Sequence, residues 1–277
     1  MIFRCFPFCF AVLFLSVGFS HDAVAQIDFD FPEADVPVLM VYEYYTEAYG
    51  ERRPTLLVYS DGRVVRPVTK NLVDDYEFTL SEQKFKDVLN KIFVEHDFET
   101  ISDKAILEEI VSKRKLKRPS PSAFRVTANK SDSSHVVDFG NTWVHDRLGM
   151  GRKRYPDAEQ LQRFLKVEEI CRELSNLALV GGEEAFQDMV KKADSEFKEA
   201  YPDGPGIGAA NLFSVRRTRN KSVTVRFRVG SKVVDPRPVS VWLTKTKDEG
   251  EISIEVKVDQ PLQLRDVPSR RAPKRVQ

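Results

Sequence analysis

The chain has little of what usually identifies a chemistry. It holds three cysteines, four histidines and a net charge of only +1 in 277 residues. The patterns G-x-S-x-G, H-E-x-x-H, C-x-x-C and the Walker loop are absent, which removes the strongest signals for hydrolases, zinc sites and nucleotide binding. Nearly balanced charge gives no global attraction to nucleic acid. With 42% hydrophobic residues, the chain can still bury a core, so we expect a folded protein without a familiar catalytic motif.

Long hydrophobic runs are confined to the start of the chain. Arg4 precedes an apolar run at 9–15, and Ala23-Val24-Ala25 fits the small-x-small pattern of signal peptidase. This predicts a signal peptide over 1–25, cleaved between Ala25 and Gln26, and an exported protein that is periplasmic or secreted. A spanning helix needs about 20 apolar residues, so an uncleaved anchor is the weaker alternative. We expect no transmembrane span after leader removal.

Cysteine is scarce in the expected mature chain. Cys5 and Cys9 belong to the leader, which leaves Cys171 alone and excludes a disulfide within the mature chain. Cys171 stands at an apolar position of a helical pattern, so we expect a buried, inert thiol rather than a nucleophile.

The first half alternates strand and helix patterns after an extended lead-in at 26–36. Asp61-Gly62 lies between two β-rich runs and predicts a hairpin. Ser81 is the expected N-cap of a helix, and a second helix is expected at 103–113. The residues expected to face inward on this second helix are Ile106, Leu107 and Ile110. Further strands (123–128, 134–139) and a helix from Asp157 to the Gly181-Gly182 pair complete a predicted α+β layer domain at 37–182, an antiparallel sheet covered on one face by helices.

The second half predicts one helix followed by a four-stranded antiparallel meander, over 183–260. The helix is expected at 183–200, and the strands at 212–217, 222–229, 239–245 and 251–258. In the second strand Thr224, Arg226 and Arg228 alternate with apolar residues, which is typical of one buried and one solvated face. The tail at 261–277 has five basic residues against one acidic residue, three prolines and no apolar period, so we expect it to be disordered.

Charge is divided unevenly along the chain. Residues 26–112 hold 9 basic and 19 acidic residues, and residues 113–277 hold 33 basic and 22 acidic residues. Solvated faces of either sign explain this division in the simplest way. Packing of the two modules on each other, or association of copies head to tail, is the sharper alternative.

One segment combines several chemically active side chains. The candidate site residues are His135, Asp138, Trp143, His145 and Asp146, which would bind a divalent metal or act as acid and base. Arg152-Lys153-Arg154, just before a helix, are candidates for anion binding. A half-exposed strand residue and an ordinary surface loop explain the same residues without any site. Five tyrosines fall at positions 42–59 and fit either a binding platform or packing under a helix, packing being favoured for Tyr59.

The run from Pro54 to Val65, together with Phe78-Thr-Leu-Ser and His96-Asp97-Phe98, resembles uncharacterised exported bacterial α+β proteins. In those proteins a strand–Asp-Gly–strand hairpin precedes a covering helix. This resemblance implies a fold and an exported location, and it implies no activity or site residue.

These features predict an exported, non-catalytic binding protein without a cofactor, whose partner is unknown; an envelope polymer or an envelope protein is one candidate. One alternative is a metal-dependent or acid/base hydrolase that uses the region of His135 and His145. Another is an envelope-associated structural protein that uses the charge asymmetry and the basic tail.

Overall fold

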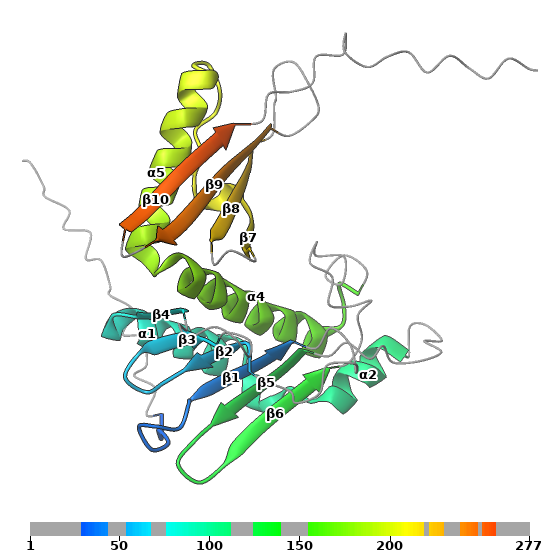
Figure 1. Ribbon diagram of the computed structural model, residues 1–277. Helices are drawn as coiled ribbons and strands as arrows, with labels where there is room; N and C mark the ends of the chain where they lie inside the picture. The colour runs from blue at the N-terminus through cyan, green and yellow to red at the C-terminus, as the bar shows by residue number, and fades with distance from the viewer. Residues whose placement is uncertain are drawn as a thin grey trace, which may run out of the picture.

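The computed structural model describes residues 29–43, 54–67, 76–111, 124–139, 155–218, 222–229, 239–248 and 251–258. The predicted signal peptide, its cleavage site and the predicted basic tail lie outside these residues. Within them, the chain forms α-helices and two antiparallel sheets, one of six strands and one of four (Figure 1). The α+β fold class predicted from the sequence is confirmed. No helix in these ranges is long and apolar enough to cross a membrane.

The six-stranded sheet has the strand order β4-β3-β2-β1-β5-β6. Its strands are β1 (Leu39–Glu43), β2 (Leu56–Val58), β3 (Arg63–Arg66), β4 (Tyr76–Thr79), β5 (Phe124–Asn129) and β6 (Ser134–Phe139). The predicted Asp-Gly hairpin joins β2 to β3, with Gly62 at φ 82°. An added Cβ at Gly62 would also meet the Leu80 carbonyl oxygen at 3.0 Å, so both conformation and space favour glycine there.

Helices cover one face of this sheet. They are α1 (Glu82–Asn90), which continues into the π-helical turn η1 (Lys91–Glu95), the 3-10 turn η2 (Phe98–Thr100), α2 (Asp103–Val111) and α4 (Glu159–Val180). Ser81 caps α1 as predicted, accepting the Lys84 N–H at 3.4 Å. The long helix α4 lies along the sheet and reaches the second module (Figure 1). Together the sheet and these helices form the first module.

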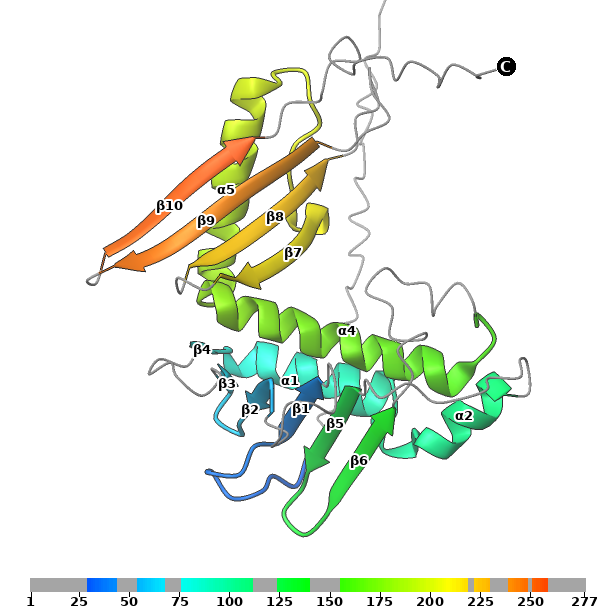
Figure 2. The ribbon, with the colours of Figure 1, turned by 45° about the vertical axis from the view of Figure 1, so that its right-hand side comes forward.

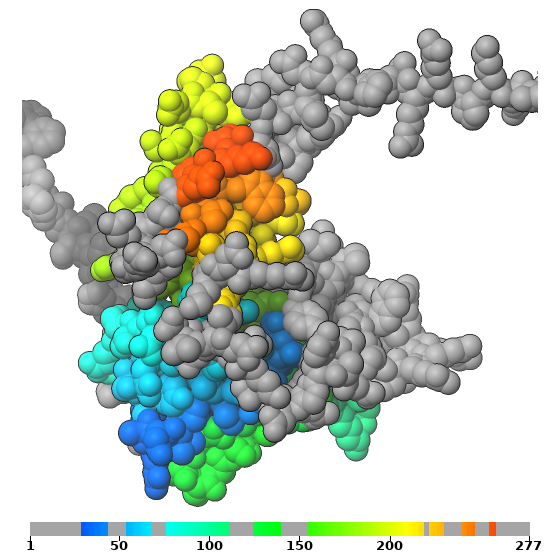
Figure 3. Space-filling model, viewed as in Figure 1, coloured from blue at the N-terminus to red at the C-terminus, as the bar shows by residue number. Residues whose placement is uncertain are grey.

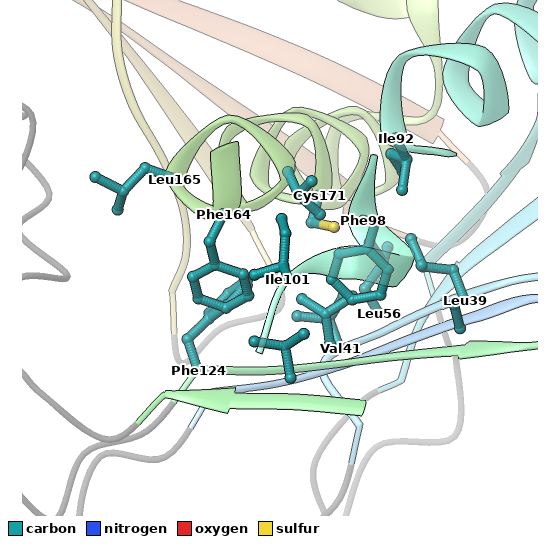
Figure 4. Packing of buried hydrophobic residues seen from close by; sticks show 14 of the residues in the cluster. Leu39, Val41, Leu56, Ile92, Phe98, Ile101, Phe124, Phe164, Leu165 and Cys171 are labelled. Carbon is teal, nitrogen blue, oxygen red and sulfur yellow. The ribbon is translucent and has the colours of Figure 1, made fainter. Parts of the chain in front are cut away.

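The core of the first module lies between the sheet and its helices. Phe98, Ile101 and Phe164 are fully buried, and Cys171 points into the same layer (Figure 4). Ile106 and Ile110 of α2 are buried as predicted. The prediction for Leu107 is wrong, since its side chain is 39% exposed. The short helix α2 contacts α4 and β6, which covers only part of its circumference.

The lead-in is anchored by an aromatic side chain. Phe29 is buried in the core, with its ring centroid 4.7 Å from that of Phe93. Ser131, in the turn between β5 and β6, donates its backbone N–H to the Asp30 carbonyl at 3.2 Å. The described part of the lead-in therefore packs on the first module.

The second module consists of one helix and the four-stranded sheet β10-β9-β8-β7. Its elements are α5 (Glu183–Ala200), the 3-10 turn η3 (Ala209–Asn211), β7 (Leu212–Arg217), β8 (Val223–Val229), β9 (Val239–Asp248) and β10 (Glu251–Val258). Figure 2 shows α5 behind the sheet, covering one face. Burial alternates along β8 with Val223, Val225, Phe227 and Val229 inside, as predicted. The predicted helix and meander are therefore confirmed.

The two modules meet at the end of α4, and in Figure 3 the second module, in yellow and orange, lies above the first module, in blue and cyan. Gly181 and Gly182 have φ of 97° and 100°, and the Gly182 N–H bonds back to the Leu177 carbonyl, so the glycine pair ends the helix as predicted. Phe78 of β4 packs against both hydrophobic clusters. Lys245 of β9 donates to the Val180 carbonyl at 2.7 Å, at the C-terminal end of α4. Since α4 contributes residues to both clusters, the boundary placed at 182 stays a prediction.

Candidate functional site

The two predicted site residues that the structure describes lie on opposite faces of β6. The His135 ring packs edge-on to Phe98, and its Nε2 donates to the Ile101 carbonyl at 3.0 Å. The Asp138 carboxylate accepts from Arg125 Nε at 2.9 Å on the face away from the helices. The histidine is thus held toward the core and the carboxylate is neutralised by arginine, so the pair does not converge on one ligand.

The other predicted site residues, Trp143, His145 and Asp146, lie outside the described residues, as does the candidate anion-binding triplet Arg152, Lys153 and Arg154. In the part of the chain that is described, no group of three or more His, Cys, Asp or Glu side chains is placed to hold a metal ion. His135 and Asp138 therefore give the metal or acid–base hypothesis no geometric support.

The tyrosine cluster is described only in part, because Tyr44, Tyr45 and Tyr49 lie outside the described residues. Tyr42 lies on the face of the first sheet away from the helices, with Arg125 Cζ 5.9 Å from its ring centroid. Tyr59 is half-buried, and Arg63 Cζ lies 4.2 Å from its ring centroid. Both rings therefore contact arginine side chains of their own sheet.

A cluster of partly buried charge lies between α4 and the end of β1. Arg172 contacts the Glu168 carboxylate at 2.6 Å and the Glu43 carboxylate at 3.5 Å, and its guanidinium lies 5.5 Å from the Phe124 ring centroid. The Glu168 side chain is only 7% exposed. One guanidinium thus compensates two carboxylates, which is the arrangement of a structural ion pair.

Cys171 lies beside this cluster and is buried. Burial raises the pKa of its thiol far above the ordinary value, and the nearby Glu168 carboxylate raises it further. The thiol is therefore protonated at neutral pH and has little thiolate for nucleophilic attack. The prediction that Cys171 is buried is confirmed.

The strongest candidate surface is the face of the second sheet that α5 does not cover. Here Arg226 of β8 is placed between two aromatic rings, with its Cζ 4.3 Å from the Trp242 centroid and 5.0 Å from the Phe213 centroid. Arg228, two residues along the strand, lies 3.5 Å from the Phe213 centroid. Guanidinium and aromatic groups thus alternate across three strands. We call Phe213, Arg226, Arg228 and Trp242 the arginine–aromatic face.

Strand register explains how these side chains meet. Arg226 pairs with Trp242 of β9 and, on its other side, with Ser214 of β7, while Arg228 pairs with Ser240. Opposite residues in an antiparallel pair share one face of the sheet, so Arg226 and Trp242 are neighbours. A register irregularity between Leu212 and Ser214 accompanies the exposed position of Phe213, whose side chain is 37% exposed.

Hydrogen bonds fix the central arginine in this stack. Arg226 donates from Nε at 3.1 Å and from Nη2 at 2.7 Å, both to the Ser240 hydroxyl. These contacts hold the planar guanidinium over the Trp242 ring, where the negative ring face attracts it. The Arg228 Nε is buried and has no hydrogen-bond partner in the structure.

Basic side chains on this face include Arg216, Arg226, Arg228 and Lys257. Among them, Arg216, Arg228 and Lys257 form no ion pair with a carboxylate of the described residues. Glu255 of β10 shares this face, at the register position of Thr244. Alternation along β8 predicted the solvated positions of Arg226 and Arg228. Phe213 and Trp242 were not predicted as part of a site, because their meeting with the arginines depends on the pairing of β7, β8 and β9.

Comparisons with family models, with curated proteins and with solved structures found no match to this chain. The case for a function therefore rests on the residues described above.

Proposed function

We propose that the protein is exported and acts as a non-catalytic binding protein for an anionic polymer of the cell envelope, through the arginine–aromatic face. The observation that carries this proposal is the guanidinium of Arg226, held between Phe213 and Trp242 next to Arg228. Export is supported by the predicted leader at 1–25 and by the single cysteine expected in the mature chain.

The geometry suits an anionic ligand for three reasons. Guanidiniums that are already oriented by rings and a hydroxyl lose less conformational freedom on binding than free side chains do. Arginine presents paired N–H donors that match carboxylate, sulfate and phosphate groups. Basic side chains of this face also lie on β7, β8 and β10, in a sheet whose neighbouring strands are about 4.8 Å apart, so a chain with repeated anionic groups can contact several of them at once.

The same geometry favours an acidic polysaccharide over single-stranded nucleic acid. Proteins that bind single strands stack bases on aromatic side chains. On this sheet both rings have guanidinium groups against them, and Phe213 has two. Recognition through the cations requires no open ring, which agrees with the expectation that nucleic acid is not the partner.

Retention of the mature protein on dextran sulfate, with neutral dextran as the reference matrix, tests the proposal. We expect retention on dextran sulfate alone, and elution as salt rises, because the Debye length falls from about 10 Å at 0.1 M to about 3 Å at 1 M. The double variant Arg226→Gln/Arg228→Gln should elute at clearly lower salt.

A matched control removes the same charge elsewhere. Lys84→Gln/Lys86→Gln, two exposed lysines of α1, should elute like the wild type. A version that ends at Gln260 lacks the predicted basic tail and should also be retained. Equal elution of the Arg226/Arg228 variant and the wild type would contradict the proposal. Stronger retention on single-stranded DNA than on dextran sulfate would instead favour nucleic acid.

A further inference from the structure

The outer strands of the two sheets differ in how their free edges are protected. A free strand edge presents unpaired backbone groups that invite pairing with another chain, and natural proteins usually cover, interrupt or shorten such edges. The outer strands here are β4 and β6 in the six-stranded sheet, and β7 and β10 in the four-stranded sheet.

Three of these strands carry a protecting feature. β4 has four residues, and its Tyr76 and Phe78 pack against the second hydrophobic cluster. On β6, the backbone N–H of Asp138 donates to the Asp103 carboxylate at 3.0 Å, so α2 supplies an acceptor at this edge. β7 has the register irregularity after Leu212 and lies against α4.

β10 carries none of these features. It pairs with β9 in an unbroken register of eight residues, from Glu251 opposite Asp248 to Val258 opposite Val241. The strand contains no proline or glycine. Figure 2 shows β10 as the outermost strand, with α5 behind the sheet and no described element beyond its outer edge. This is therefore the most regular free edge in the described part of the molecule.

The side chains of β10 suit a second copy of the same strand. Glu255 and Lys257 are exposed and lie on the face of the arginine–aromatic group. Val256 and Val258 are half-buried against the second hydrophobic cluster, and so retain apolar surface at the edge. A strand with one acidic and one basic residue two positions apart can complement itself in antiparallel pairing.

We propose that two copies of the protein associate by antiparallel pairing of their β10 strands, which joins the two four-stranded sheets into one sheet of eight strands. A two-fold axis that passes midway between the two copies of Val256 places Glu255 of each copy opposite Lys257 of the other. Registers centred on Glu255 or on Lys257 oppose like charges, which destabilise strand pairing. In the register at Val256, two opposite-charge pairs thus form between residues whose side chains the structure describes.

This association also arranges the candidate binding surfaces. A two-fold axis perpendicular to the sheet keeps the same face of each copy on the same side. The two arginine–aromatic faces would then lie on the same side of one sheet, which lets a single polymer contact both copies. The pairing itself requires no ligand, so it stands or fails independently of the proposed function.

Light scattering coupled to size-exclusion chromatography, over a wide range of concentrations of the mature protein without polyanion, tests the pairing. We expect a reversible dimer. In the variant Lys257→Glu, two glutamates lie opposite each other at each of the two former charge pairs. This like-charge contact should raise the dimer dissociation constant by about tenfold or more. The double variant Glu255→Lys/Lys257→Glu exchanges the two charges and should restore the wild-type dimer.

Arg216→Glu makes the same charge change on β7, at the opposite edge of the sheet, and should leave the dimer intact. Circular dichroism and melting curves of each variant confirm that it folds. A monomer at every concentration would overturn the proposal. So would a dimer that is insensitive to Lys257→Glu, or a double variant that remains as dissociated as the single one.

Discussion

The two modules place their arginines in different surroundings. In the first module Arg125, Arg163 and Arg172 each contact a carboxylate, of Asp138, Asp97 and Glu168 respectively. In the second sheet Arg226 and Arg228 contact aromatic rings. Arg217 does so as well, with its Cζ 5.5 Å from the Tyr76 ring centroid.

The difference separates two uses of the same side chain. A guanidinium with a carboxylate partner contributes little net field, because the two charges cancel at a distance. A guanidinium on a ring is held as firmly but keeps its positive charge available to other anions. The first module therefore uses arginine to join its elements, while the ring contact of Arg228 agrees with the ligand-binding role that we propose for the second sheet.

The largest expected effect tests whether the two modules are independent in stability. Phe164 and Phe227 are fully buried, one in each hydrophobic cluster. We expect Phe164→Ala and Phe227→Ala each to lower the free energy of unfolding by about 3–5 kcal/mol. Because α4 and Phe78 belong to both clusters, each variant should unfold in one transition.

Urea unfolding followed by far-UV circular dichroism and by tryptophan fluorescence checks this, in a Trp143→Phe background that leaves Trp242 as the sole fluorophore. Coincident transitions by both probes indicate one cooperative unit. A Phe227→Ala variant whose fluorescence transition moves, while a second transition by circular dichroism stays at the wild-type urea concentration, would show that the modules unfold separately.

A smaller effect tests the contrast between the arginines directly. Arg172→Gln removes the guanidinium that contacts the Glu168 carboxylate, 7% exposed, and should cost about 3 kcal/mol of unfolding free energy. Arg228→Gln removes only a contact with a ring and should cost less than about 1 kcal/mol. The exposed pair Lys166–Glu169 gives the control, because Lys166→Gln should change stability by less than about 0.5 kcal/mol.

Urea unfolding measures all three variants under the same conditions. If Arg228→Gln lowers the unfolding free energy as much as Arg172→Gln does, the arginines of the second sheet stabilise the fold as those of the first module do. The proposal that they bind a ligand would then lose its main support.

Local patterns predicted much of this fold. Alternation along β8 gave its buried and solvated faces, Asp61-Gly62 gave the hairpin, and Gly181-Gly182 gave the end of α4. Each of these signals acts between residues that are close in the sequence, where the backbone and its nearest side chains decide the conformation.

Features that depend on distant residues were not predicted. The N-terminus of α4 shows this, because Asp157 was expected to open the helix but the N-cap is Ala158. The carboxylate of Glu109, from α2, accepts the Gln160 and Leu161 N–H groups at 3.0 and 3.3 Å. Likewise, the pairing of β1 with β5 and the meeting of Phe213 with Arg228 follow from register and not from a local pattern.

The smallest expected effect concerns Cys171, which lies on the helix that both modules share. Burial raises the pKa of its thiol, so a thiol reagent should react only when α4 is exposed. Reductant should leave the melting temperature unchanged, since the mature chain is expected to hold no second cysteine; a clear decrease would indicate a disulfide between copies.

Labelling of Cys171 in increasing urea sharpens the comparison of the modules. Labelling is carried out under conditions in which the protein refolds faster than the thiol reacts. If the two modules unfold as one unit, the labelling rate of Cys171 should then rise with urea as steeply as the unfolding equilibrium constant measured by Trp242 fluorescence. Fast labelling with a weak urea dependence would mean that the first module opens around α4 while the second remains folded, and the two hydrophobic clusters would then be separate in stability as well as in composition.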